Sequence, residues 1–143
     1  MRVHDVLKGK KIQEVVKVSP EATVTDLLTL LAQHNVGAVV VSSDGEALDG
    51  IVSERDVVRR LNEDRGVLDR RVAEIMTSVV HTCEGTESVD DLMQLMTTKR
   101  VRHVPVVADG ALVGVISIGD VVKSRIEELE FERDQLDKYV HTT

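Results

Sequence analysis

The chain has 143 residues, enough for one compact domain or for two small ones that share a core. Hydrophobic residues make up 42% of it but aromatic residues only 1%, which suits short buried aliphatic strands and argues against proteins that stack nucleic-acid bases on aromatic rings. The net charge of −7, from 25 acidic and 18 basic residues, disfavours a phosphate-backbone binder, and we expect no nucleic-acid partner.

An internal repeat organises the chain. Eight residues of the first half have identical partners 65 positions later, beginning with Val15 and Val80. After a one-residue deletion the offset becomes 64, and five further identities follow: Gly50, Ser53, Asp56, Val57 and Val58 match Gly114, Ser117, Asp120, Val121 and Val122. Glycine, serine and aspartate align in the same frame as the valines, so the match indicates two copies of one structural unit.

Both copies predict the same elements in the same order. The first contains a leading segment from Val3, a strand over Val15–Val18, a helix from Val24 capped by Thr23, strands over Ala38–Val41 and Leu48–Val52 joined at Asp44-Gly45, and a helix after Ser53. The second contains a leading segment from Val72, a strand over Val79–Thr82, a helix from Val89 capped by Ser88, strands over Val104–Val107 and Leu112–Ile116 joined at Asp109-Gly110, and a helix after Ser117.

The fold class that follows is α/β (α+β), with two β-α-β-β-α repeats related by a pseudo-two-fold axis. We assign residues 1–66 and 67–124 to the repeats and residues 125–143 to a helical extension. The last helix is predicted to run from Ile118 to about Val140. Its apolar residues fall at alternating four- and three-residue steps, interrupted only by Arg133: Val122, Ile126, Leu129, Leu136 and Val140. A helix of roughly 33 Å is too long for one small domain to cover, so we expect it to pack on a second chain; folding back on its own core is the alternative.

These residues resemble a pair of cystathionine-β-synthase (CBS) domains. The motif of that family, a glycine, two aliphatics, Ser or Thr, two variable residues and Asp, occurs as GIVSERD (Gly50–Asp56) and GVISIGD (Gly114–Asp120). Each copy lies where a strand is predicted to give way to a helix. The resemblance covers Val3–Lys123, and the tail is similar to a bacterial subgroup in which the pair stands alone.

The motif has a chemical rationale. A helix that begins just after Ser53 or Ser117 presents N–H groups and a hydroxyl that can hold phosphate. Asp56 and Asp120 then lie in the first helical turn, where a carboxylate can accept both hydroxyls of a ribose. The structural alternative is that each serine is an N-cap and each aspartate complements the helix dipole.

The resemblance also implies an apolar adenine slot in each copy. The slot residues it indicates are Val16, Lys17, Val18, Ala22 and Thr23 in the first copy, and His81, Thr82 and Cys83 with Glu87 and Ser88 in the second. For phosphate the candidates are Ser53, Arg55, Ser117, Arg102 and His103. Because Arg102-His103 aligns with Gly37-Ala38, the two clefts are not expected to be equivalent.

Other classes of function lack support in the sequence. Dinucleotide-binding, P-loop, zinc-protease and serine-hydrolase motifs are absent, and the five histidines show no metal-ligand spacing, so we expect no enzyme, no metal and no catalytic cofactor. A single cysteine, Cys83, excludes an internal disulfide. Without a signal peptide or an apolar stretch of about 18 residues, we expect no membrane contact and a cytoplasmic location.

Two functions remain to be distinguished. The resemblance implies a homodimeric sensor, held together by its CBS pairs and its C-terminal helix, that binds AMP, ADP, ATP or NAD. A downstream protein, which the sequence does not identify, would recognise the ligand-bound state. The alternative is an interaction scaffold that uses the same fold without nucleotide.

Overall fold

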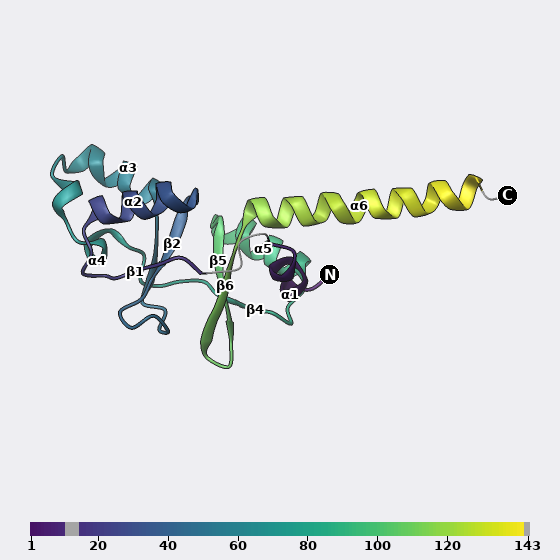
Figure 1. Cartoon of the computed structure of the whole chain (residues 1–143), viewed down its shortest axis with the longest axis horizontal. Helices are drawn as coiled ribbons and strands as arrows, with labels where there is room; N and C mark the ends of the chain where they lie inside the picture. Colours follow the sequence, from purple (N-terminus) through teal and green to yellow (C-terminus); the bar gives the residue numbers. More distant parts are fainter. Residues whose placement is uncertain (11–14, 142–143) are drawn as a thin grey trace.

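The computed structural model describes residues 1–10 and 15–141. Its first repeat contains β1 (Lys17–Val18), α2 (Val24–His34), β2 (Ala38–Val41), β3 (Gly50–Ser53) and α3 (Glu54–Glu63). Its second repeat contains β4 (Cys83–Glu84), α5 (Val89–Lys99), β5 (His103–Ala108), β6 (Ala111–Ser117) and α6 (Ile118–His141). Figure 1 shows the first repeat at the left, the second in the centre, and α6 extending to the right.

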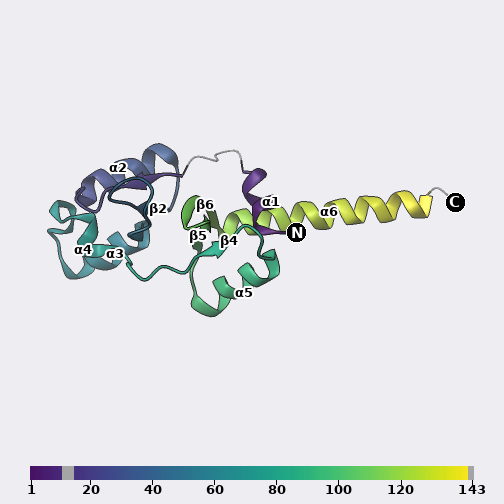
Figure 2. The ribbon, with the colours of Figure 1, turned by 90° about the horizontal axis from the view of Figure 1, so that it is seen from below.

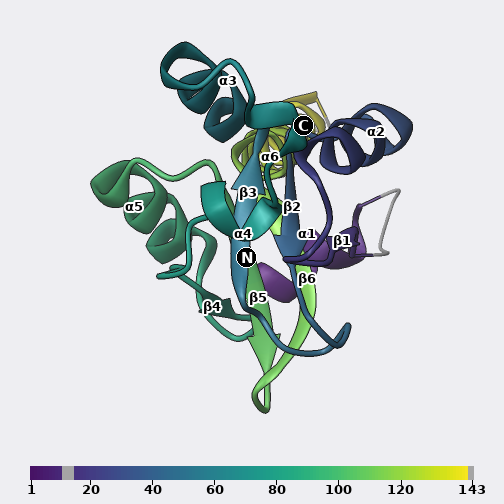
Figure 3. The same ribbon diagram turned by 90° about the vertical axis from the view of Figure 1, so that its left-hand side faces the viewer.

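Each repeat forms a three-stranded sheet of the same topology. The middle strand pairs in parallel with the first strand and antiparallel with the last, in the orders β1-β2-β3 and β4-β5-β6. The view from the first repeat, in Figure 3, shows α2, α3 and α5 arranged around the strands. The predicted fold class, two mixed α/β repeats with a long C-terminal helix, is confirmed.

The helices α2 and α5 begin where their N-caps were predicted. The hydroxyls of Thr23 and Ser88 accept hydrogen bonds from backbone N–H groups three residues later, at 3.1 Å in both cases. Each helix ends at a residue in the left-handed conformation, Asn35 with φ of 51° and Arg100 with φ of 54°. That conformation stops the helix and turns the chain back into the middle strand of its sheet.

The strand predicted over Val79–Thr82 is wrong, because the structure places β4 at Cys83–Glu84. The backbones of Thr77 and Ile51 exchange two hydrogen bonds of 2.9 Å, which tie the segment before β4 to the first repeat. Val79 is 81% exposed. Pairing with β5 therefore begins only after the chain has crossed to the second repeat.

The two hairpins differ in length. In the second, Asp109 and Gly110 both have positive φ, 51° and 79°, which is the two-residue turn that the sequence predicts. In the first, the carboxylate of Asp44 accepts hydrogen bonds from two backbone N–H groups of a longer loop, so β3 begins at Gly50 rather than at Leu48. β1 likewise covers only two residues of the predicted strand.

Two short helices, which we call the leading helices, precede the repeats and pack in the opposite one. α1 (Val3–Lys8) places Val3 in the hydrophobic core of the second repeat, whereas α4 (Val72–Ile75), after the 3-10 turn η1 (Val67–Asp69), places Val72 in the core of the first. The Val3 N–H donates to the carbonyl of Glu87 at 2.9 Å and the Val72 N–H donates to the carbonyl of Ala22 at 2.8 Å, so backbone hydrogen bonds also join each leading helix to the opposite repeat. Figure 2 shows α1 beside the second repeat and α4 beside the first. The repeat boundaries at residues 66 and 124 stay a prediction. They divide the chain by sequence, whereas each leading helix packs in the core of the opposite repeat.

The helix α6 is continuous from Ile118 to His141, as predicted. Its first turns pack on the second repeat through the buried Val121, and the rest extends away from the body (Figure 1). The large apolar side chains exposed along it after Ile118 are Val122, Ile126, Leu129, Phe131, Leu136, Tyr139 and Val140. Residues 142 and 143 of the predicted extension lie outside the described residues.

Candidate functional site

Both motif aspartates face back to the serine three residues earlier. The backbone N–H of Ser53 donates to Asp56 Oδ2 at 2.8 Å, and that of Ser117 donates to Asp120 Oδ2 at 2.9 Å. In return, the serine hydroxyls accept from the aspartate N–H groups at 3.3 and 3.2 Å. The N-capping role considered as the structural alternative is thus present in both copies.

The first N–H groups of α6 are largely satisfied. Ile118 N–H donates to the carbonyl of Arg102 at 2.8 Å, and Asp120 N–H donates to the Ser117 hydroxyl. Two of the three donors in the first turn are therefore engaged within the protein. Phosphate binding near this helix would depend on basic side chains more than on its backbone.

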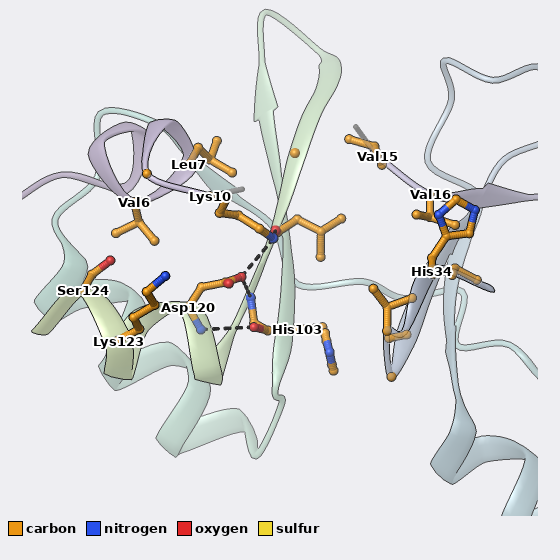
Figure 4. A pocket seen from close by; sticks show the side chains of 18 of the residues that line it. Val6, Leu7, Lys10, Val15, Val16, His34, His103, Asp120, Lys123 and Ser124 are labelled. Atoms are coloured by element: carbon orange, nitrogen blue, oxygen red, sulfur yellow. Dashed lines mark hydrogen bonds and ion pairs between the residues drawn. The ribbon is translucent and has the colours of Figure 1, made fainter. Parts of the chain in front are cut away.

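A cavity of about 540 Å³ lies between the two repeats, and Figure 4 shows its walls. One wall comes from the end of α1, from β6 and from the start of α6, which contributes Asp120. The facing wall comes from the first repeat, with Val15 and Val16, the end of α2 at His34, and the turn from Val36 into β2. The cavity is lined by both repeats, with an apolar side of valines and a polar side around Asp120.

On the polar side, the Lys10 ammonium forms an ion pair with Asp120. Lys10 Nζ lies 2.9 Å from Asp120 Oδ2 and donates to the carbonyl of Val115 at 2.7 Å. Burial alone would raise the pKa of Asp120, but the Ser117 N–H and the Lys10 ammonium outweigh it and hold that pKa below its usual range. Asp120 is therefore ionised at neutral pH.

His103 lies at the junction of the repeats. A Cβ atom built on Gly37 would be 3.8 Å from His103 Cε1, so the imidazole reaches the first repeat. Burial lowers the pKa of His103, with Lys10 and Arg102 adding to that effect while Asp120 and Glu54 oppose it. The ring is neutral at neutral pH and could offer phosphate a hydrogen bond, but not a charge.

The predicted site residues divide into two groups. Asp120, Ser117, His103 and Val16 line this cavity. The other candidates are not among its described lining residues: Ser53, Arg55, Asp56, Arg102, Lys17, Val18, Ala22, Thr23, His81, Thr82, Cys83, Glu87 and Ser88. Cys83 is instead a buried member of the second core, where burial raises the pKa of its thiol to about 12.

Four basic side chains in the lining were not among the predicted site residues, namely Lys8, Lys10, His34 and Lys123. For Lys8 and Lys10 the signal was the lysine-rich stretch directly after the first leading segment, Lys8 to Lys11, whereas no sequence signal marked His34 or Lys123. That signal could not be assigned to Asp120 because the contact depends on α1 packing against the second repeat.

Across residues 1–10 and 15–141, no group of three or more His, Cys, Asp or Glu side chains is placed to hold a metal ion. In the same ranges, no helix has the length and apolar character needed to cross a membrane.

Comparison with known proteins identifies the family to which this fold belongs. The family model of the CBS domain matches the chain twice, at residues 5–63 and 72–127. The chain therefore belongs to the CBS domain family and carries a tandem pair.

Proteins named for their CBS domains are among those similar to this chain. The mitochondrial CBS domain-containing protein CBSX3 of Arabidopsis thaliana is 41% identical over 82% of this chain, which spans about 60% of that relative's length. A putative signal-transduction protein with CBS domains from Burkholderia ambifaria is 41% identical and has a TM-score of 0.84, covering 89% of this chain and 95% of its own. CBSX2, solved in complex with AMP, is 28% identical and has a TM-score of 0.75, covering 88% of this chain and 96% of its own.

Proposed function

We propose that this chain is a regulatory module, without catalytic activity of its own, that binds an adenine nucleotide in the cavity between its repeats. The observation that carries the proposal is the ionised Asp120 carboxylate, which lines a cavity that also presents apolar side chains, among them Val15 and Val16, beside several basic ones. A carboxylate accepts both hydroxyls of a ribose, and a valine-lined slot suits a purine ring. CBSX2, a relative of similar fold, was solved with AMP.

In this proposal, each wall of the cavity would contact a different part of the ligand. Val15 and Val16 of the first repeat would contact adenine, Asp120 would hold the ribose, and phosphate would face the basic side chains near Lys10. AMP is the ligand we favour, and ADP, ATP and NAD are the alternatives that a binding panel separates. Because both repeats line the cavity, ligand binding would stabilise their present arrangement, which a partner protein could recognise.

The test is calorimetric titration of AMP into the wild type and into Asp120→Ala. Loss of hydrogen bonds to a charged acceptor should weaken binding by about 1–3 kcal/mol. Asp56→Ala is the matched control, because it removes the same motif residue from the repeat whose aspartate does not line this cavity. Undiminished affinity in Asp120→Ala, with circular dichroism showing an intact fold, would contradict the proposed site.

A second function, an interaction scaffold that binds no nucleotide, has one observation in its favour. Both motif aspartates already accept hydrogen bonds from capping serines, so neither needs a ligand to satisfy its carboxylate. A wild type that binds none of the four nucleotides would favour the scaffold.

We further propose that the module acts as a homodimer. The exposed stripe along α6 supports this, since Ile126, Leu129 and Leu136 are each more than half exposed. Apolar side chains at alternating steps of three and four residues are typical of helices that pack against another helix. The contact would add to one between the CBS pairs themselves.

A further inference from the structure

The lysine that follows α1 occupies the carboxylate that the proposed ligand needs. Lys10 Nζ lies 2.9 Å from Asp120 Oδ2 and 2.7 Å from the carbonyl oxygen of Val115. The side chains of Lys10 and Asp120 are only 25% and 24% exposed, so this ion pair is partly shielded from solvent. Figure 4 shows Lys10 reaching across the cavity wall to Asp120.

Within residues 1–10 and 15–141, no lysine forms an ion pair with the motif aspartate of the first repeat. Aligning the leading segments from Val3 and Val72 places Val79 opposite Lys10, and Val79 is 81% exposed. Among the described residues, the hydrogen bonds of the Asp56 carboxylate come from Ser53 alone. The lysine is therefore a feature of one cleft and not of the CBS motif.

The charges around the cavity differ from those of the whole protein. Three lysines, Lys8, Lys10 and Lys123, line it beside two carboxylates, Asp120 and Glu127. The chain as a whole carries a net charge of −7. An excess of ammonium groups in a cavity of an acidic protein favours an anionic ligand.

We propose that Lys10 makes the Asp120 cleft selective for phosphorylated nucleosides over the free nucleoside. This inference rests on the proposed function. A ribose that donates its hydroxyls to Asp120 competes with the Lys10 ammonium for the same oxygen. With adenosine the displaced ammonium gains no new partner, whereas with AMP it pairs with the phosphate.

The chemistry of lysine suits this exchange. Its ammonium carries three donors on a flexible four-carbon stem, so it can leave one anion and bind another without backbone movement. Charge-assisted hydrogen bonds to phosphate replace those lost at the carboxylate. Lys10 thus acts as a specificity-determining residue that contacts Asp120 in the ligand-free protein and phosphate in the complex.

The experiment compares AMP and adenosine by calorimetry in the wild type, Lys10→Met and Lys10→Arg. We expect Lys10→Met to weaken AMP by about 10-fold or more and to leave adenosine unchanged or tighter, since Asp120 is then unpaired. Lys10→Arg, which keeps the charge, should retain a preference for AMP. Lys138→Met, with the same change of charge on the exposed end of α6, is the control and should match the wild type.

A second measurement needs no ligand. In the free protein, Lys10→Met should raise the pKa of the Asp120 carboxyl, followed by NMR, because the neighbouring positive charge is gone. An unchanged ratio of AMP to adenosine affinity in Lys10→Met, or an unchanged Asp120 pKa, would overturn the inference while leaving the nucleotide site standing. A wild type that binds neither ligand would overturn the proposed function and this inference with it.

Discussion

The two motif glycines allow a matched test of how the leading helices are exchanged. A Cβ atom at Gly50 would lie 2.7 Å from the carbonyl oxygen of Thr77 and 2.9 Å from Met76 Sδ, both just after α4. A Cβ atom at Gly114 would lie 2.6 Å from Leu7 Cδ2 in α1. Each glycine thus lets a segment of the other copy cross closely over its strand. An added methyl group would meet mainly the backbone of Thr77 at Gly50, but the side chain of Leu7 at Gly114.

The expected costs follow from what has to move. In Gly50→Ala the Thr77 backbone must shift, although it exchanges two hydrogen bonds of 2.9 Å with Ile51. Overpacking of this kind costs about 1–3 kcal/mol, and weakening the two hydrogen bonds adds roughly 1 kcal/mol. In Gly114→Ala the half-buried Leu7 changes its side-chain torsions, at about 0.5–1.5 kcal/mol, and reduced backbone freedom in the unfolded chain offsets part of that.

The assay is urea unfolding followed by far-ultraviolet circular dichroism, because the chain has no tryptophan to report by fluorescence. We expect the free energy of unfolding to fall by about 2–4 kcal/mol in Gly50→Ala and by about 1 kcal/mol or less in Gly114→Ala. Since Leu7 and Gly114 both line the cavity, Gly114→Ala should also weaken AMP binding. Equal destabilisation by the two substitutions, or a larger effect of Gly114→Ala, would refute the reasoning.

Three further predictions concern the tail, the difference between the two predicted clefts, and the buried thiol. Leu129→Asp combined with Leu136→Asp should weaken the proposed dimer by several kcal/mol, at about 1.5–3 kcal/mol per leucine, and light scattering should show a concentration-dependent shift toward monomer. A double variant with wild-type mass, helicity and melting temperature would argue against the tail contact. Arg102→Ala should weaken binding in only one of the two clefts that the repeat predicts, a cleft other than the cavity described above, which Arg102 does not line. The loss should shrink as salt is added, whereas titrations that resolve two identical sites in the wild type would count against any asymmetry. Because burial raises the pKa of the Cys83 thiol to about 12, a thiol reagent at pH 8 should react with it only when the protein unfolds, and rapid labelling of the native protein would exclude that burial. The free energy of unfolding should also decline as the pH rises above about 9, because the unfolded chain then loses this proton while the folded chain keeps it.

Much of the fold could be predicted because its signals are local. Thr23 and Ser88 cap their helices as helix-start signals, and Asp109-Gly110 is a turn signal that demands positive φ. The strand predicted over Val79–Thr82 failed for the opposite reason. Its valines suit a strand, but just before them Thr77 pairs with Ile51 of the other repeat. A pairing between residues so far apart in the sequence leaves no local pattern from which it could be predicted.

The candidate site was predictable in its motif but not in its surroundings. The spacing from Ser117 to Asp120 marks the start of a helix, and the structure places both residues on the cavity. Lys10 is 110 positions away from Asp120 in the sequence and reaches it only because α1 packs in the second repeat. Which wall faces Asp120 likewise depends on how the repeats meet, so the contribution of Val15 and His34 could not be derived from either repeat alone.

The position of Asp120 links the cavity to the exposed tail. Asp120 lies in the first turn of α6, and the same uninterrupted helix carries Leu129 and Leu136 beyond the body. A helix of 24 residues is about 36 Å long, so a tilt of roughly 5° at its base displaces its far end by ~3 Å. A ligand that replaced Lys10 on Asp120, as proposed above, would act at that base. If the tail joins two chains, a small change at the ligand would therefore become a larger one at the protomer contact, where a partner protein could detect it.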